Sequence, residues 1–444
     1  MRHDQHGVPL TAATPTAVAE FDRAVDSLLH LRADVGDLAE RAVAEDPLLP
    51  MGNALRVYLS VLSTDPQLVV ATTDEFAKFT SLADPAAMTE TERLHLGAAG
   101  RLLQGDLTGA AELLTEVSAR QPRDALALAI GHQLDFLLGA AGALRDRIGA
   151  VLPSWSVADP HFANLLGMYA FGLEECGHWA EAEQTGLRAM AMDAADVWSI
   201  HAVGHTHEMR GRHAEGITLF DQRREDWDGA NLMRVHIWWH YCLFLLEAGD
   251  PDRALAIYDA ELAPSGSEGL LEVLNGASLL WRMRLADLPV ADRWPALAAT
   301  WPARMSTPFS AFNDMHAVMC YVGAGDERAA EELIADRRRY LGQVSGSVTN
   351  AAMTARVGLP VCEALLAFGR ERYAEAVDLL WPVRRRVHEF GGSHAQRDVV
   401  QRTLVEAALR SGRTEQARVL VGERVSLRPD SPYNQLKLRQ LRQP

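Results

Sequence analysis

The chain has 444 residues, of which 48% are hydrophobic and 23% charged, fractions that are typical of folded globular proteins. Asp and Glu total 59 against 43 for Lys and Arg, so the formal net charge is −16. An acidic chain lacks the clustered cations that bind a phosphate backbone, and we therefore expect no nucleic-acid partner.

The chain begins with a polar arm, residues 1–15, which contains His3, Asp4 and His6 and either stays loose or folds back. The arm has no apolar h-region of a secretory signal, and no later stretch has the roughly 18 apolar residues that span a bilayer. The four cysteines are far apart in apolar helical contexts, which is typical of reduced core thiols. We expect a cytoplasmic protein with no membrane partner.

The rest of the chain, residues 16–444, is predicted to be all-α. Apolar residues recur at i, i+3, i+4 and i+7, and the alternation typical of β-strands is nearly absent. A glycine followed by polar residues and an Ala-rich helix start recurs along the chain. Such a glycine suits the left-handed residue that ends the first helix of a pair. These turns are predicted at Gly105, Gly139, Gly177, Gly211, Gly249, Gly325, Gly369 and Gly412, with Ala286-Asp287 in place of a glycine in the longest interval.

The spacing of these turns, from 34 to about 44 residues once the longest interval is divided, is typical of tetratricopeptide-like helical hairpins. Such hairpins cannot bury their apolar faces alone, so they stack on their neighbours. The sequence therefore predicts one domain over residues 16–444, a right-handed superhelical α-solenoid of about ten or eleven degenerate helix pairs.

Histidines are concentrated in two short stretches, HAVGHTHE and HIWWH. The i, i+4 spacing puts His201 and His205 on one helix face, and it does the same for His236 and His240. Glu208 continues the first stripe. Both pairs fall in the first helix of a unit, and first helices line the concave wall of such arrays. We predict that the four imidazoles face a shared interior space.

Two later stretches place further polar groups on first helices, and the curvature of the array is expected to bring them across the same hollow. They are FNDMH, with Asn313, Asp314 and His316, and GGSHAQRDV, with His394, Gln396 and Asp398 after the predicted N-cap Ser393. A single histidine on a semi-apolar helix is more often a hydrogen-bonded core residue. Burying several unpaired polar groups costs roughly 1–3 kcal/mol each, however, so the joint pattern favours a functional cluster.

Several segments together resemble the tetratricopeptide repeat protein 38 family, over nearly the whole chain: HAVGHTHEMRGR, HIWWHYCLFLLEAGDPDRALAIYD, ASLLWRMRL, FNDMHAVM, GMYAFGLEECGHWAEAE and GGSHAQRDV. The resemblance implies a soluble solenoid of degenerate helical repeats and no defined activity. The family pattern is matched at Asp196, Trp198, His201, His205, Glu208, His236, Trp239, His240, Asn313, Asp314, His316, His394, Gln396 and Asp398. Asn275 stands where the family tends to have an acidic residue, and His207 is an addition.

The main functional hypothesis is a concave pocket that binds a small polar molecule and transforms it by His/carboxylate acid–base chemistry. Catalytic roles are predicted for His201, His205, Glu208, His236, His240, Asp314, His316, His394 and Asp398. Ligand-binding roles are predicted for Asp196, Trp198, Trp239, Asn313 and Gln396. No nucleophile motif or phosphate-binding loop is present, so the reaction class stays open.

Two alternatives stay open beside this hypothesis. His201, His205, His236 and His240 have the spacing to bind Zn or Fe, although the H-E-x-x-H and repeated E-x-x-H motifs are absent. The other alternative is a non-catalytic scaffold that holds a protein or peptide, as helical repeats commonly do. Against a peptide clamp, the inner positions are His, Asp, Glu and Trp rather than Lys, Arg and Asn. The sequence defines neither the ligand nor the oligomeric state.

Overall fold

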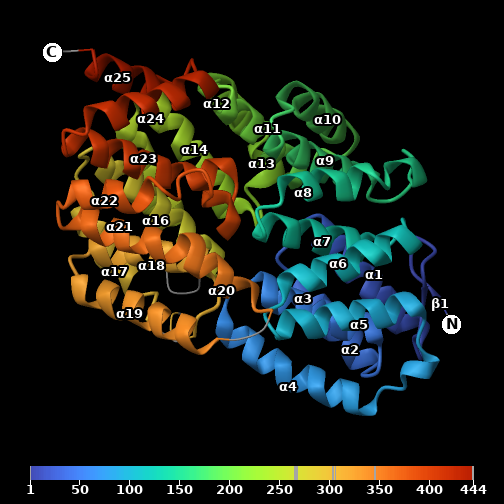
Figure 1. Ribbon diagram of the computed structural model, residues 1–444. Helices are drawn as coiled ribbons and strands as arrows, with labels where there is room; N and C mark the ends of the chain where they lie inside the picture. The colour runs from blue at the N-terminus through green and yellow to red at the C-terminus, as the bar shows by residue number, and fades with distance from the viewer. Residues whose placement is uncertain (1, 265–268, 303–304, 306, 345–346, 443–444) are drawn as a thin grey trace. The chain divides into compact units, whose positions relative to one another are not determined.

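The computed structural model describes residues 2–264, 269–302, 305, 307–344 and 347–442. This part of the chain is built almost entirely of helices (Figure 1). The sheet within it is a short antiparallel hairpin of β1 (Arg2–His3) and β2 (Pro9–Leu10). The predicted all-α class, built from tetratricopeptide-like helix pairs, is confirmed.

Residue contacts divide the chain into two compact units. The first comprises residues 1–203, 225–234 and 347–349, and the second comprises residues 204–224, 235–346 and 350–444. One helix, α11 (Val197–Met209), is continuous across the boundary at residue 203. The single domain predicted over residues 16–444 stays a prediction.

Consecutive helices of the first unit form antiparallel-type pairs joined by short turns. The pairs are α1 (Pro15–Leu29) with α2 (Val35–Glu45), α3 (Pro50–Leu62) with α4 (Pro66–Leu82), α5 (Glu90–Leu103) with α6 (Leu107–Arg120), α7 (Ala125–Leu137) with α8 (Ala141–Gly149), and α9 (Phe162–Glu175) with α10 (Trp179–Met192). Short 3₁₀ helices lie at η1 (Pro85–Ala87) and η2 (Leu152–Ser154), and α13 (Arg224–Trp227) is a single turn.

The second unit continues the same construction. Its elements are α12 (His213–Gln222), α14 (Arg234–Ala248), α15 (Pro251–Ile257) with the π-helix η3 (Tyr258–Leu262), α16 (Leu270–Leu285), η4 (Ala291–Arg293), α17 (Trp294–Ala298), α18 (Ala311–Gly323), α19 (Glu327–Gln343), α20 (Thr349–Met353) with the π-helix η5 (Thr354–Gly358), α21 (Leu359–Gly369), α22 (Tyr373–Leu380), η6 (Val387–Phe390), α23 (His394–Arg410), α24 (Thr414–Leu427) and α25 (Pro432–Gln440).

Most of the predicted turns end a helix on a left-handed glycine. Those with positive φ are Gly105, Gly139, Gly177, Gly211, Gly249, Gly325 and Gly412. Asp287 (φ 57°) takes this place at the turn predicted without a glycine. The turn predicted at Gly369 is shifted, because Gly369 is the last residue of α21 and Glu371 (φ 59°) is the left-handed residue. Leu31 (φ 54°) and Thr64 (φ 57°) mark earlier turns that a search for glycine misses.

The N-terminal arm folds back on the first unit, which is one of the two predicted alternatives. The amide of Thr11 donates to Glu92 Oε1 at 2.6 Å, and the amide of Ala13 donates to Asp46 Oδ2 at 2.7 Å. His6 is 5% exposed. The arm is therefore held by specific hydrogen bonds.

Two glycines set the close packing of helices in the second unit. A Cβ on Gly204 of α11 would lie 2.6 Å from Phe220 Cζ on α12, and a Cβ on Gly216 of α12 would collide with the ring of Phe244 on α14. Since only glycine leaves room for these rings, α12 packs closely against both α11 and α14. These contacts hold the two helices that carry the paired histidines.

The helical segment Thr349–Gly369 is, by length and a mean hydropathy of 1.4, apolar enough to cross a membrane. Within its most apolar window 56% of the residues are buried inside the protein. A core helix passes the same test of length and composition, so one such segment is weak evidence for a membrane span.

Candidate functional site

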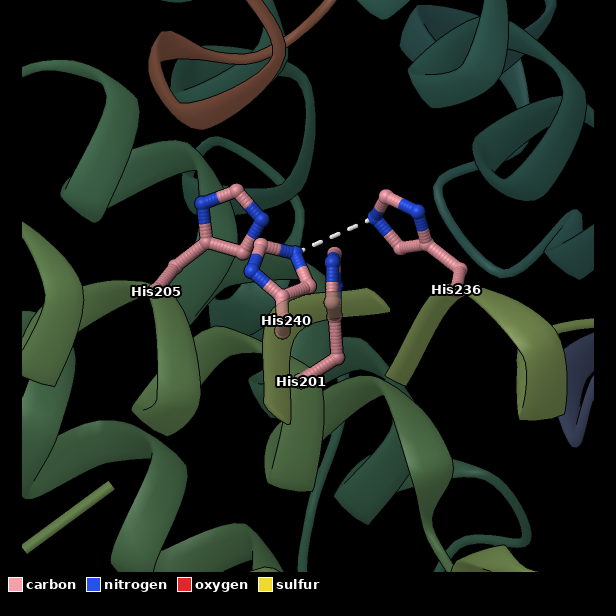
Figure 2. Close-up of side chains that lie close together, drawn as sticks. All are labelled: His201, His205, His236 and His240. Atoms are coloured by element: carbon pink, nitrogen blue, oxygen red, sulfur yellow. Dashed lines mark hydrogen bonds between the residues drawn. The ribbon is translucent and has the colours of Figure 1, made fainter. Parts of the chain in front are cut away.

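Four histidine side chains converge from two helices (Figure 2). His201 and His205 lie one turn apart on α11, and His236 and His240 lie one turn apart on α14. Each ring offers a nitrogen, and these four atoms lie within 4.8 Å of one another. His205 and His240 are fully buried, with ring centroids 4.4 Å apart. The predicted convergence of the two i, i+4 pairs is present in the structure.

The outer nitrogen of His236 is held by Asn275 on α16. His236 Nδ1 lies 2.8 Å from Asn275 Oδ1, and Asn275 Nδ2 donates to the backbone oxygen of Leu271 at 2.9 Å. Because a carbonyl only accepts, the amide group of Asn275 has one orientation, and its oxygen faces His236. His236 therefore carries a proton on Nδ1 and has a lone pair on Nε2.

The outer nitrogen of His240 is held by Glu208, which follows His205 by one turn of α11. His240 Nδ1 lies 3.0 Å from Glu208 Oε2, and the Glu208 side chain is 10% exposed. Burial raises the pKa of Glu208 to about 6, although nearby His205 and Arg428 lower it. At pH 7 the carboxylate accepts the Nδ1 proton of His240.

The two inner nitrogens face each other across a short gap. His240 Nε2 lies 3.2 Å from His236 Nε2, the contact drawn as a dashed line in Figure 2. Burial lowers the pKa of His236 to about 4, so this ring is neutral at pH 7. If both rings carry their proton on Nδ1, facing Asn275 and Glu208, each Nε2 has a lone pair. The two lone pairs then point at each other, which is repulsive unless a cation lies between them. A proton shared by the two Nε2 atoms, or a metal ion bound to both, would relieve this repulsion.

Aromatic and cationic groups surround the imidazoles. Trp239 stacks on His236 with ring centroids 5.1 Å apart and an interplanar angle of 17°, and the guanidinium of Arg282 lies 5.3 Å from the Trp239 ring. Burial lowers the pKa of Arg282 to about 9, and the charges of Asp398 and Glu208 partly oppose this shift. Trp239, predicted to bind a ligand, is fully buried and packs against the histidine rings.

The cavity next to Glu208 is small. It has a volume of about 20 Å³ and is lined by Glu208, His213, Glu247, Arg402, Arg428 and Ser431, among others. A volume of this size holds about one water molecule. This cavity is therefore too small for the small polar molecule that the main hypothesis places here.

Asp314 and His316, predicted as catalytic, make contacts other than those of an acid–base pair. Both oxygens of Asp314 accept from Arg337 Nε at 2.9 Å, and both residues are 2% exposed. His316 Nδ1 donates to the backbone oxygen of Phe312 on its own helix at 2.8 Å. Asn313 lies in the first turn of α18, where its amide donates to Ser310 Oγ at 3.4 Å. The Asp314 carboxylate therefore pairs with the buried guanidinium of Arg337, which the sequence analysis did not consider.

The third predicted stretch serves mainly helix capping and ion pairing. Gln396 forms a capping box with Ser393 at the start of α23. Asp398 accepts from Arg424, Arg402 and Arg428 at 2.6, 2.6 and 2.7 Å. Burial alone would raise the pKa of Asp398, but the three guanidiniums hold it well below its usual range. His394 is exposed on the first turn of α23.

Asp196 and Trp198 lie in the first unit, at the start of α11. Asp196 Oδ2 accepts from the amide of Ser199 at 3.2 Å, and its other oxygen accepts from Asn164 Nδ2 at 3.2 Å. Burial raises the pKa of Asp196 to about 7. Trp198 packs edge-on against His132, with ring centroids 5.4 Å apart. These contacts show Asp196 capping the helix that carries His201 and Trp198 packing beside it, and the predicted ligand-binding roles stay predictions.

Sequence reasoning missed two features of chemical interest. Asn275 appeared only as a departure from the acidic residue of a family pattern, yet its amide orients His236. A second group, Asp26, His30 and His161, comes together in the first unit. The i, i+4 spacing of Asp26 and His30 was a visible signal for it, whereas the approach of His161 from a distant turn was not.

Comparison with known proteins shows similar helical-repeat structures at low identity. No protein-family model matches the chain. A tetratricopeptide repeat protein from Parabacteroides merdae ATCC 43184 is 12% identical, with a TM-score of 0.32, over 71% of this chain and 98% of that one. The tetratricopeptide repeat domain of P58(IPK) is 14% identical, with a TM-score of 0.21, over 90% of this chain and 99% of that one. At such TM-scores the likeness says nothing about function, and the resemblance to the tetratricopeptide repeat protein 38 family stays a prediction.

Proposed function

We propose that this helical-repeat protein binds a divalent transition-metal ion, with Zn²⁺ as the best fit, at its histidine cluster. His205, His236 and His240 are the principal ligands, and His201, one turn before His205, is the fourth. The observation that carries the proposal is the 3.2 Å approach of the Nε2 atoms of His236 and His240 while both of their Nδ1 atoms face fixed acceptors.

The geometry fits zinc in distance and in chemistry. In a tetrahedral site with Zn–N bonds of about 2.0–2.1 Å, ligand nitrogens lie about 3.3 Å apart. The measured 3.2 Å matches this separation. Metal-bound histidines typically donate their other N–H to a carboxylate or carbonyl, which fixes the ring and strengthens the ligand. Glu208 and Asn275 supply these two acceptors.

A proton is the competitor for the same position. In the metal-free protein, one proton between His236 and His240 relieves the repulsion of the two lone pairs, and Glu208 balances its charge. Metal ligands must be deprotonated, so Zn²⁺ binding at pH 7 is expected to release about one proton from this pair. Calorimetry in two buffers of different ionisation enthalpy measures that number.

The direct test is elemental analysis combined with titration of the full chain by Zn²⁺, after metal is removed with a chelator. His240→Ala and His205→Ala are expected to lose Zn²⁺ binding at this site. His388→Ala, which changes an exposed histidine on η6, is the matched control and is expected to bind as the wild type does. Co²⁺ substitution should give the intense visible absorption of a tetrahedral nitrogen site.

Loss of folding is checked by circular dichroism on each metal-free variant. If the folded His240→Ala protein takes up Zn²⁺ with the affinity and stoichiometry of the wild type, the metal site at this cluster is refuted. If the wild type takes up no Zn²⁺, Fe²⁺ or Co²⁺ at pH 7.5, the cluster binds a proton alone.

A scaffold function is the second candidate, supported by an open groove in the second unit. The groove has a volume of about 700 Å³ between α17, α18 and α19. Its lining combines apolar residues, Ala298, Tyr321 and Leu333, with carboxylates, Asp326 and Glu332. Such a surface suits the apolar face of a basic amphipathic helix. An array of Lys- and Arg-containing amphipathic peptides tests it: Ala329→Arg, in the groove lining, should abolish the binding that the wild type shows.

A further inference from the structure

A second cluster of metal-ligating side chains lies in the first unit, independent of the site proposed above. Asp26 lies in the last turn of α1, His30 is the C-cap residue that follows this helix, and His161 immediately precedes α9. Each of the three offers a ligand atom within 4.8 Å of the others. Asp193, which follows α10, adds a second carboxylate, with Oδ2 3.2 Å from His30 Nε2.

The contacts inside this cluster are short. His161 Nε2 lies 2.9 Å from Asp26 Oδ1, and His30 Nε2 lies 3.2 Å from Asp193 Oδ2. Ligand atoms bound to one transition-metal ion lie about 3 Å apart, so these side chains need little movement to share an ion. The side chains of Asp26 and Asp193 are 35% and 30% exposed, which gives an ion a route from solvent.

The Nδ1 atom of each histidine contacts a further group outside the cluster: a backbone oxygen for His30 and a ring nitrogen for His161. His30 Nδ1 donates to the backbone oxygen of Asp26 at 2.8 Å, the contact that commonly orients a metal-bound imidazole. His161 Nδ1 lies 3.1 Å from His6 Nε2. His6 is 5% exposed, and its Nδ1 is buried with no hydrogen-bond partner among the described residues. The buried imidazole of His6, from the N-terminal arm, thus contacts the cluster through His161.

With both imidazoles neutral, the charged groups of the cluster sum to one negative charge. Asp26 and Asp193 carry two negative charges, and Arg32, which bonds the second oxygen of Asp26, carries one positive charge. His30 lies between two acceptors, the backbone oxygen of Asp26 and the carboxylate of Asp193. Both of its nitrogens therefore need a proton, or one of them needs a metal ion.

His161 occupies an unusual backbone position. It is the N-cap residue of α9 with φ 67°, and its side chain makes no capping hydrogen bond. Left-handed backbone is uncommon for residues other than glycine, although Asn, Asp and His adopt it several-fold more often than the rest, and an N-cap usually uses its side chain to cap the helix. Here the side chain turns instead to Asp26 and His6.

We propose that Asp26, His30, His161 and Asp193 form a second site for a divalent transition-metal ion, Zn²⁺ or Mn²⁺, which ties the N-terminal arm to the first unit through His6. Two carboxylates and two imidazoles are a common ligand set for such ions. The arm contributes no ligand of its own, yet His6 packs on His161 with ring centroids 5.1 Å apart. Occupancy of the site therefore holds the arm in place.

The test uses the full chain with the proposed zinc site of His205, His236 and His240 disabled by His240→Ala. In this background, Zn²⁺ is expected to bind at the first-unit site and to slow amide exchange over residues 2–10. His161→Asn, whose side chain tolerates left-handed backbone, should abolish both effects. His178→Asn, at an exposed histidine of the same unit, is the matched control.

Readouts at the two sites separate the proposals. The wild type is expected to bind about two Zn²⁺ per chain, with His240→Ala and His161→Asn each losing about one. If His161→Asn leaves the stoichiometry unchanged and Zn²⁺ does not slow exchange in the arm, the second site is refuted and protons alone balance it. If His161→Asn loses one Zn²⁺ and His240→Ala loses none, the site at His205, His236 and His240 is refuted instead.

Discussion

The orientation of His236 by Asn275 gives the sharpest prediction. Asn275→Leu removes the acceptor 2.8 Å from His236 Nδ1 and leaves a buried N–H without a partner. In the metal-bound protein the ring cannot turn to find another acceptor, because Nε2 is held by the ion. An unsatisfied buried donor costs about 1–3 kcal/mol, which corresponds to roughly 10–100-fold weaker Zn²⁺ binding.

The assay is competition for Zn²⁺ against a chromophoric chelator at pH 7.5, with the metal-free stability of each variant measured by urea denaturation. Asn275→Asp is the paired variant, because it keeps an acceptor and adds a negative charge. A carboxylate makes the imidazole a stronger ligand, so Zn²⁺ should bind at least as tightly as in the wild type. Equal Zn²⁺ affinity for Asn275→Leu and the wild type would refute the role assigned to Asn275.

Three further predictions concern stability. Burial lowers the pKa of His132 from 6.5 to about 3. As pH falls, His132 of the unfolded chain is therefore protonated before His132 of the folded protein, and the free energy of unfolding decreases between pH 6.5 and 3. The loss amounts to roughly 4 kcal/mol by pH 3, and His132→Gln should flatten the urea-unfolding curve against pH; parallel curves would contradict this. Gly204→Ala puts a Cβ 2.6 Å from Phe220 and should destabilise the protein by about 1–3 kcal/mol in thermal unfolding, whereas an unchanged melting temperature would mean the helices can separate freely. Glu371→Gly relieves a left-handed residue (φ 59°) and should gain about 0.5–1 kcal/mol, while Glu371→Ala gains nothing; equal effects of the two would exclude backbone strain as the cause.

Much of the fold could be predicted because the turn within each helix pair depends on a few neighbouring residues in the sequence. A left-handed residue must end the first helix, and glycine adopts that conformation at least cost. Where another residue takes the place, as at Thr64 and Glu371, the signal is weak or shifted, although the helix pair still forms. Packing of neighbouring helices compensates for the strain at those turns. The residues that pack there come from other parts of the chain, so the sequence of the turn does not predict it.

The histidine pairs could be predicted for a similar reason. The i, i+4 spacing within α11 and within α14 fixes which rings share a face, whatever the rest of the chain does. The partners of those rings come from residues far apart in sequence: Asn275 lies 39 residues from His236, and Glu208 lies 32 residues from His240. Spacing within one helix puts the imidazoles and Glu208 on their helix faces, but it carries no information about which group contacts which ring on another helix.

The buried carboxylates show why residue type alone cannot assign chemistry. Glu208, Asp314 and Asp398 were all predicted from the sequence to be catalytic. In the structure Asp314 accepts from Arg337 and Asp398 from three guanidiniums, while Glu208 accepts from His240. A buried carboxylate must be satisfied by whichever strong donor lies within reach, and arginine brings a permanent charge that holds the carboxylate ionised and its lone pairs occupied. An imidazole partner, unlike arginine, keeps a second ring nitrogen that can bind a proton or a metal ion. The choice between arginine and histidine as partner therefore separates the structural carboxylates from Glu208, the one assigned to the proposed site.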